Sequence, residues 1–136
     1  MVPVAALVAA FALTSPAFHA GGTIPQRYTC DGQNLSPALR WTAPPRGTTR
    51  LTLTVTDPDA PSGSFVHWRA SGISPKSRGL KVGQHAPREG QNDAGGTGWT
   101  GPCPPSGTHR YVFVLRAYRG SKLLGSARLV GRYSRS

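Results

Sequence analysis

The stretch Arg50–Pro61 reads RLTLTVTDPDAP and is the clearest structural signal in the chain. Apolar residues alternate with threonines over its first half, which is the period of a β-strand with one buried face. The residues expected to face the core are Leu51, Leu53 and Val55. Continued alternation places Asp57 on the same side, where a carboxylate has to be hydrogen-bonded or paired. Pro58 and Pro61 lack the N–H that a ladder needs, so we expect the strand to end near Asp57.

Three further stretches indicate strands. Tyr111–Leu115 (YVFVL) is apolar on both faces, which predicts a central strand covered on both sides. Ser64–Ala70 predicts a shorter strand with Phe65, His67 and Arg69 on one side and Val66 and Trp68 on the other. Ser126–Tyr133 predicts a final strand, whereas residues 71–108 are rich in Gly, Pro, Ser and Asn and are typical of loops. The pattern predicts one mostly-β domain.

Composition limits the function classes. A chain of 136 residues has room for one domain, and its 38% apolar content argues against disorder. No apolar run is long enough to span a membrane as a helix. The net charge of +11 suggests polyanions. The arginines are not interleaved with stacking aromatics, however, so we expect a solvated surface, weak attraction to anionic membranes and no specific nucleic-acid partner.

The first 26 residues contain no Asp, Glu, Lys or Arg. Val4–Leu13 has the length and composition of a signal-peptide core, and Ala10–Ala12 is a candidate cleavage site, but Met1–Pro3 supplies no basic side chain. We therefore expect residues 1–12 to be either a leader remnant or a buried strand, and residues 13–136 to form the domain. Export to the envelope, periplasm or exterior is the first expectation, with a cytoplasmic location as the alternative.

The scarce acidic residues point to a site. Only five occur, and Asp57 and Asp59 lie one residue apart on a proline-rich turn. His67 follows nearby, and the glycine-rich segment Gly96–His109 runs into the strand that begins at Tyr111.

These motifs resemble the phosphatidylethanolamine-binding protein family, in its bacterial Raf-kinase-inhibitor-like branch. The strings that carry the resemblance are DPDAP at 57–61 and GPCPPSGTHRY at 101–111, supported by LTSPAF at 13–18 and LVGRY at 129–133. The resemblance implies a compact β fold around a large antiparallel sheet, with a small anion-binding cavity. It maps the cavity onto Asp57, His67, Gly101, Pro105, His109 and Tyr111, with Asp59 in support.

The chemistry of these residues suits an anion. Imidazole and phenol groups donate hydrogen bonds, a carboxylate can orient an imidazole, and glycines let backbone N–H groups approach a phosphate. The chain also departs from the family, because Tyr118–Leu124 replaces the helical segment that usually follows the HRY strand. We therefore expect one wall of the domain to be reduced.

Cys30 and Cys103 both lie in family-like motifs. Paired, they would close a loop of about 70 residues and stabilise the fold by about 4 kcal/mol. Such a disulfide would fit an exported protein, because cytosolic thiols stay reduced. The alternative is two separate buried thiols.

The first functional hypothesis is non-enzymatic binding of a phosphate-bearing or other small anionic group, such as a phospholipid headgroup. One alternative is an inhibitor of a kinase or protease that acts through a surface loop within Ser71–Asn92. The other is a small hydrolase that uses Asp57, His67 and His109. Neither a nucleophile-elbow motif nor a zinc-ligand spacing occurs, so we expect no metal and no cofactor.

Overall fold

The computed structural model describes residues 10–136. Most of the expected leader segment therefore lies outside the described residues. At its end, the Ala12 N–H donates to Thr42 Oγ1 (2.8 Å), and the Thr42 hydroxyl donates to the Ala10 carbonyl (2.9 Å). No helix among the described residues is long and apolar enough to cross a bilayer.

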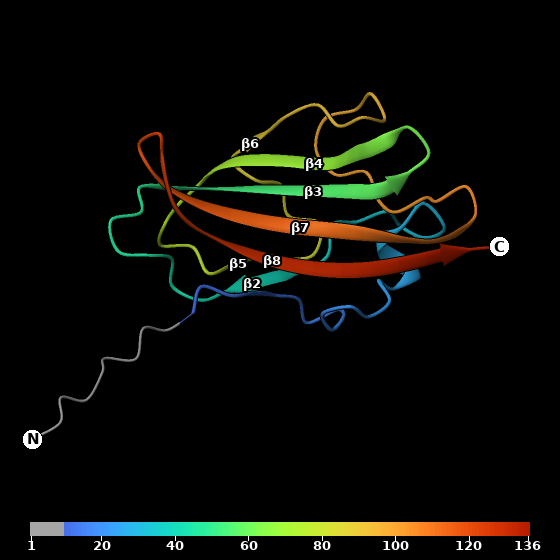
Figure 1. The fold of residues 1–136 in the computed structure, drawn as a ribbon, viewed down its shortest axis with the longest axis horizontal. Coiled ribbons are helices and arrows are strands. Elements are labelled where there is room, and N and C mark those ends of the chain that lie inside the picture. The colour runs from blue at the N-terminus through green and yellow to red at the C-terminus, as the bar shows by residue number, and fades with distance from the viewer. Residues whose placement is uncertain (1–9) are drawn as a thin grey trace, which may run out of the picture.

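Two antiparallel sheets make up the domain (Figure 1). The large sheet has five strands in the order β6-β4-β3-β7-β8, and the small sheet has three in the order β1-β2-β5. The large sheet consists of β3 (Arg50–Ala60), β4 (Gly63–Ile73), β6 (Arg88–Glu89), β7 (Gly107–Arg119) and β8 (Lys122–Arg135). The small sheet consists of β1 (Leu13–Thr14), β2 (Leu39–Trp41) and β5 (Gly79–Leu80), and one short 3₁₀ helix spans Gln26–Tyr28. The predicted mostly-β single domain is confirmed.

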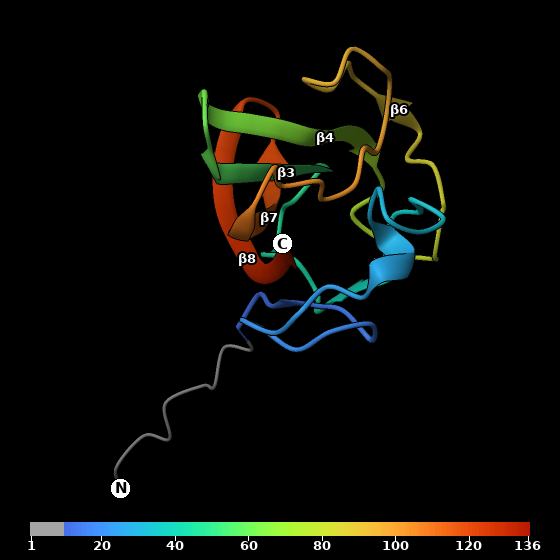
Figure 2. The same cartoon turned by 90° about the vertical axis from the view of Figure 1, so that its right-hand side faces the viewer.

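The core lies between the large sheet and the remainder of the chain, which is gathered on one side of it (Figure 2). Leu51, Leu53 and Val55 of β3 are fully buried, as the alternation predicts. On β7, Phe113 and Leu115 stand opposite Val55 and Leu53, so antiparallel register brings the apolar faces of both strands together.

The predicted end of β3 is wrong by a few residues, because the strand continues to Ala60. The pairing of β3 with β4 is irregular between Asp57 and Ala60, and the pairing with β7 ends at Thr56. Pro58 therefore lies where no regular ladder hydrogen bond is required, and its missing N–H costs little there.

The prediction that Tyr111–Leu115 is covered on both sides is also wrong. Tyr111, Phe113 and Leu115 face the core, whereas Val112, which is buried outside the core cluster, and the half-buried Val114 point to the opposite side. No second layer of the described chain lies over that side (Figure 2). The valines are flanked by cross-strand neighbours within the sheet, such as Thr56 and Thr54 on β3.

The connection after the HRY strand is short, as expected. β7 ends at Arg119 and β8 begins at Lys122, so Gly120 and Ser121 form the turn, and Gly120 has a positive φ of 58°. This turn lies at the end of the hairpin opposite His109, at the left in Figure 1. The reduced wall is therefore remote from the predicted site residues of β7.

Gly131 of β8 is a position where packing requires glycine. A Cβ there would lie 2.6 Å from Ile24 Cγ1 and 2.7 Å from Phe18 Cε2, inside the core. We expect Gly131→Ala to lower the free energy of unfolding by about 1–3 kcal/mol, because overpacking forces neighbours out of position. Urea denaturation measures this. The control is Gly96→Ala, whose Cβ would meet nothing closer than 3.7 Å and which should change stability by less than about 0.5 kcal/mol; equal effects of the two variants would contradict the packing argument.

Candidate functional site

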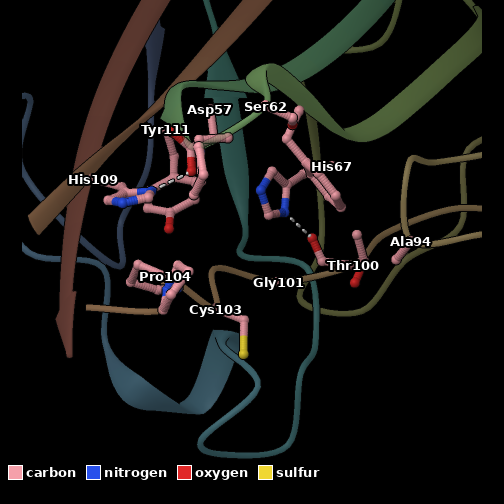
Figure 3. Close-up of a pocket in the computed structure, with 14 residues that line it drawn as sticks. Asp57, Ser62, His67, Ala94, Thr100, Gly101, Cys103, Pro104, His109 and Tyr111 are labelled. Atoms are coloured by element: carbon pink, nitrogen blue, oxygen red, sulfur yellow. Dashed lines mark hydrogen bonds and ion pairs between the residues drawn. The ribbon is translucent and has the colours of Figure 1, made fainter. Parts of the chain in front are cut away.

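A cavity of about 380 Å³ lies at the end of the large sheet where β3 leaves the core and β7 enters it (Figure 3). Its walls come from the β3–β4 turn, the start of β7 and the loop that precedes β7. The lining residues are Asp57, Ala60, Pro61, Ser62, Phe65, His67, Ala94, Thr100, Gly101, Cys103, Pro104, Pro105, His109 and Tyr111.

Strand register brings three of the predicted residues together. Thr56 pairs with Val112, and both point away from the core, so Asp57 and Tyr111 point toward it. His109 is two residues before Tyr111 on the same strand and shares its face. The alternation in both strands therefore carries these side chains into one cavity.

A β-bulge supplies His67. Val55 pairs with Trp68 and Thr56 pairs with Val66, which leaves His67 as an extra residue in β4. Both His67 and Trp68 are consequently buried, so the simple alternation predicted for this strand is wrong here. The bulge turns an imidazole into the cavity without removing the indole from the core.

Asp57 holds the ring of His109. Its Oδ2 lies 2.6 Å from His109 Nδ1, and its Oδ1 accepts a hydrogen bond from the Asp59 N–H at 2.7 Å. Asp57 is 3% exposed and His109 is 9% exposed. Both carboxylate oxygens have partners, which satisfies the condition for burying this group and fixes the orientation of the imidazole.

His67 is held by a backbone carbonyl. Its Nδ1 lies 2.7 Å from the Thr100 carbonyl oxygen, which can only accept, so Nδ1 carries the proton and Nε2 is left for other partners. The ring stands edge-on to Tyr111, with 5.2 Å between centroids. Burial lowers the pKa of His67 below its ordinary value of 6.5, against opposing contributions from the Thr100 carbonyl and the Asp57 charge.

Tyr111 brings an unpartnered hydroxyl. The residue is fully buried, and its Oη has no hydrogen-bond partner among residues 10–136. Burial, followed by the charge of Asp57, raises the pKa of Tyr111 well above its ordinary value of 10, so the phenol stays protonated and can donate. Figure 3 shows the phenol between the rings of His109 and His67.

Gly101 lines the cavity for a reason other than the one expected. Its N–H donates to Asn34 Oδ1 at 2.8 Å and is not free for an anion. A Cβ at this position would collide with Asn34 Oδ1, the Tyr28 carbonyl oxygen and Thr29 Cα. Glycine is therefore needed for the close approach of two loops.

Asp59 does not line the cavity. Its carboxylate accepts hydrogen bonds from the Arg110 backbone N–H (2.8 Å), Nε (3.0 Å) and Nη2 (2.8 Å). These bonds hold the pKa of Asp59 well below its ordinary value. Asp59 thus supports the site indirectly, through the N–H that it donates to Asp57.

Several lining residues were not predicted. Thr100 acts through its carbonyl oxygen, which any residue type could provide, so no sequence signal identifies it. Ser62 lies on the β3–β4 turn and could have been suspected from the preceding DPDAP motif. Among the described residues, no hydrogen bond joins the Ser62 hydroxyl to His67 or His109.

Cys30 and Cys103 form a disulfide, with 5.5 Å between their Cα atoms. The pairing is confirmed, and the alternative of two separate thiols is wrong. The bond ties the segment after the 3₁₀ helix to the cavity loop, where the Cys30 N–H also donates to the Pro102 carbonyl (3.1 Å). Cys103 itself lines the cavity.

The family follows from comparison with known sequences. A sequence model described as "Phosphatidylethanolamine-binding protein" matches residues 14–132. The chain belongs to this family. A relative from Methanothermobacter thermautotrophicus, named a UPF0098 protein, is 40% identical over 90% of this chain and 98% of its own.

Solved structures of family members share the fold. The structure of CT736 from Chlamydia trachomatis, described as a candidate homologue of phosphatidylethanolamine-binding protein, has a TM-score of 0.89 and 32% identity, over 93% of this chain and 99% of its own. The structure of E. coli YbcL, described as a member of the mammalian family, has a TM-score of 0.85 and 28% identity, over 94% of this chain and 100% of its own.

A Mycobacterium tuberculosis relative, named as a candidate lipoprotein (LppC), is 44% identical over 76% of this chain. The chain spans about half the length of that relative, at 53%.

The disulfide should contribute substantially to stability. We expect Cys30→Ser/Cys103→Ser to lower the free energy of unfolding by about 4 kcal/mol, because the crosslink restricts the unfolded chain over a separation of 73 residues. Urea unfolding of this variant and of the native protein, each with and without reductant, measures the effect. Reductant should destabilise only the native protein; equal stability of the two proteins would contradict this assignment.

Proposed function

We propose that the cavity binds a phosphate-bearing or other small anionic group, such as a phospholipid headgroup or a phosphorylated ligand, without catalysing a reaction on it. The observation that carries the proposal is the buried, unpartnered hydroxyl of Tyr111 in a cavity also lined by two oriented imidazoles. A buried donor without a partner costs free energy, which an acceptor brought by a ligand would recover. The family name, which refers to phosphatidylethanolamine, agrees with a phosphate ester.

Electrostatics support an anion in spite of the aspartate in the wall. Both oxygens of Asp57 are directed at the His109 ring and the Asp59 N–H, and its side chain is only 5% exposed. Two other groups that line the cavity can donate: the Tyr111 hydroxyl stays protonated, and the His67 ring has no hydrogen-bond partner at Nε2 among the described residues.

Export is part of the proposal. The disulfide favours an oxidising compartment, and the name of the mycobacterial relative agrees with an envelope location. The inhibitor and hydrolase alternatives remain predictions without a structural observation that favours either over binding.

Histidine resonances provide the central test. Titration with inorganic phosphate should shift the imidazole signals of His67 and His109 saturably. His85 is an internal control, because its side chain is 87% exposed and lies outside the cavity lining, and His19 is a second exposed control. Unchanged His67 and His109 signals in folded protein at millimolar phosphate would overturn the proposal.

Removal of the Tyr111 hydroxyl should separate binding from stability. We expect Tyr111→Phe to weaken phosphate binding by about 10-fold or more, because a hydrogen bond to a charged group is lost. The free energy of unfolding should stay the same or rise, because a buried hydroxyl without a partner disappears. Calorimetric titration and urea unfolding measure the two quantities; a loss of stability that parallels the loss of binding would indicate a structural role.

Anion binding should strengthen as the pH falls. The free protein holds the pKa of His67 below 6.5, and an anion at Nε2 favours the protonated ring, so the bound state takes up a proton. Affinity for sulfate, whose charge is constant in this range, should rise from about pH 7.5 downward and level off below the free-state pKa of His67. His67→Gln keeps an N–H donor but does not titrate, so its affinity should vary less with pH. An unchanged pH profile in that variant would exclude His67 as the source.

A further inference from the structure

The side of the large sheet that faces away from the core forms an open surface of the molecule. It faces the viewer in Figure 1, where the small sheet lies behind it, and it lies at the left in Figure 2, where the small sheet and most loops lie to its right. We call this side the outer face. It includes Arg50, Thr52, Thr54, Thr56, Arg69, Arg110, Val112, Val114, Arg116, Tyr118, Leu123, Ser126, Arg128, Val130 and Arg132.

Register arranges these side chains in rows across the sheet. Thr56, Val112 and Val130 form one row, and the next contains Thr54, Val114 and Arg128. Arg132 stands opposite Arg110 in a further row, and Arg116 stands between Thr52 and Ser126. Short β-branched side chains thus form a flat floor from which guanidinium groups project.

Three arginines of this surface lack an acidic partner in the described part of the chain, whereas Arg110 and Arg69 on the same side of the sheet pair with Asp59 and Asp93. All five acidic residues of the chain lie within the described part, and none has a carboxylate oxygen within 4.0 Å of Arg116, Arg128 or Arg132. Arg116 donates to Thr54 Oγ1 at 3.1 Å, and Arg128 and Arg132 are exposed. The outer face therefore presents fixed positive charge in a single plane.

An exposed leucine lies on the same face. Leu123 stands opposite Tyr118 beside the hairpin turn, and it is the large hydrophobic residue that the described part of the chain leaves most exposed, at 50%. Arg119 and Lys122 flank the turn and are exposed. Basic side chains around an apolar one are typical of protein surfaces that bind the interface of an anionic bilayer.

We propose that the outer face docks on an anionic lipid surface, with Arg116, Arg128 and Arg132 near the lipid phosphates and Leu123 in the interfacial layer. A nucleic acid fits this face less well. Among the described residues no helix lies on this face that could enter a groove. The Tyr118 ring is covered by the Arg50 guanidinium, 4.3 Å from its centroid, so this ring offers no free stacking surface.

The cavity is not part of the outer face. It is lined by residues of the inner face and lies at the end of β7 opposite the turn beside Leu123. The surface and the cavity are thus separate sites, and the docking proposal does not depend on what the cavity binds.

Vesicle sedimentation tests the docking proposal. The probe is vesicles of phosphatidylcholine with about 30% phosphatidylglycerol, compared with pure phosphatidylcholine, at about 0.05 M and 0.5 M salt. The native protein should bind the anionic vesicles at low salt, release them at high salt and ignore the neutral ones. Arg128→Glu/Arg132→Glu should weaken binding at least about 30-fold, since each basic residue near an anionic surface contributes about 1 kcal/mol. Leu123→Ser should weaken binding at low salt, although it leaves the net charge unchanged.

The matched control is Arg40→Glu/Lys76→Glu, which changes net charge equally at exposed positions off the outer face. It should retain most of the binding. Equal losses in the two double variants would show a net-charge effect and overturn the proposal, as would absence of binding by the native protein. Tighter binding to duplex DNA than to the vesicles, lost in the outer-face variant, would assign the surface to nucleic acid instead. Both double variants should unfold cooperatively in urea with a midpoint close to that of the native protein, which shows that they are folded.

Discussion

A carboxylate at the buried end of a strand has to be satisfied, and the organisation of the site follows from how the chain does this for Asp57. One oxygen pairs with His109 at 2.6 Å and the other accepts the Asp59 N–H. The contact with His109 joins β3 to β7 across 52 residues of sequence. The bond from the Asp59 N–H fixes the backbone of the DPDAP motif, where the β3–β4 turn begins. The Asp59 side chain is in turn held by Arg110, next to His109. The buried charge thus positions an imidazole and stabilises the loop that forms the cavity wall.

The large sheet has two chemically different faces because the side-chain period of a strand is two. On β7, the odd-numbered residues point inward: His109 and Tyr111 line the cavity, and Phe113 packs in the core. The even-numbered Val112 and Arg116 belong to the outer face. One strand can therefore serve a small ligand and a large charged surface without conflict. The pairing with β8 preserves this separation, since Gly131 stands opposite Tyr111 and Val130 opposite Val112.

The sequence predicted those parts of the fold that depend on local periodicity. The alternation at 51–55 identified β3, and the motifs at 57–61 and 101–111 drew attention to Asp57, His109 and Tyr111, which line the cavity. The bulge at His67 could not be predicted, because it depends on the register between β3 and β4 and not on the residues of β4 alone. Register also explains why a strand of apolar residues at 111–115 is covered on one side only, since Val112 and Val114 find neighbours within the sheet.

The role of Gly101 shows a different limit. A glycine beside a phosphate-type cavity suggests a free N–H, but here the N–H is taken by Asn34 and the missing side chain makes room for Tyr28 and Thr29. Only the position of the facing loop distinguishes these two uses of glycine.

The distribution of charge connects the site to the surface. Each of the five acidic residues is engaged: Asp31 with Tyr133 and Arg135, Asp57 with His109, Asp59 with Arg110, Glu89 with Trp68 and His85, and Asp93 with Arg69 and the Val66 N–H. The acids are thus used to position aromatic, imidazole and guanidinium groups, and none of them pairs with Arg116, Arg128 or Arg132 of the outer face. The net charge of +11 therefore does not produce the same electrostatic potential over the whole molecule. The positive potential is expected to be strongest where arginines lack acidic partners. The cavity, in contrast, contains an uncharged hydroxyl and imidazoles whose orientation is fixed by hydrogen bonds.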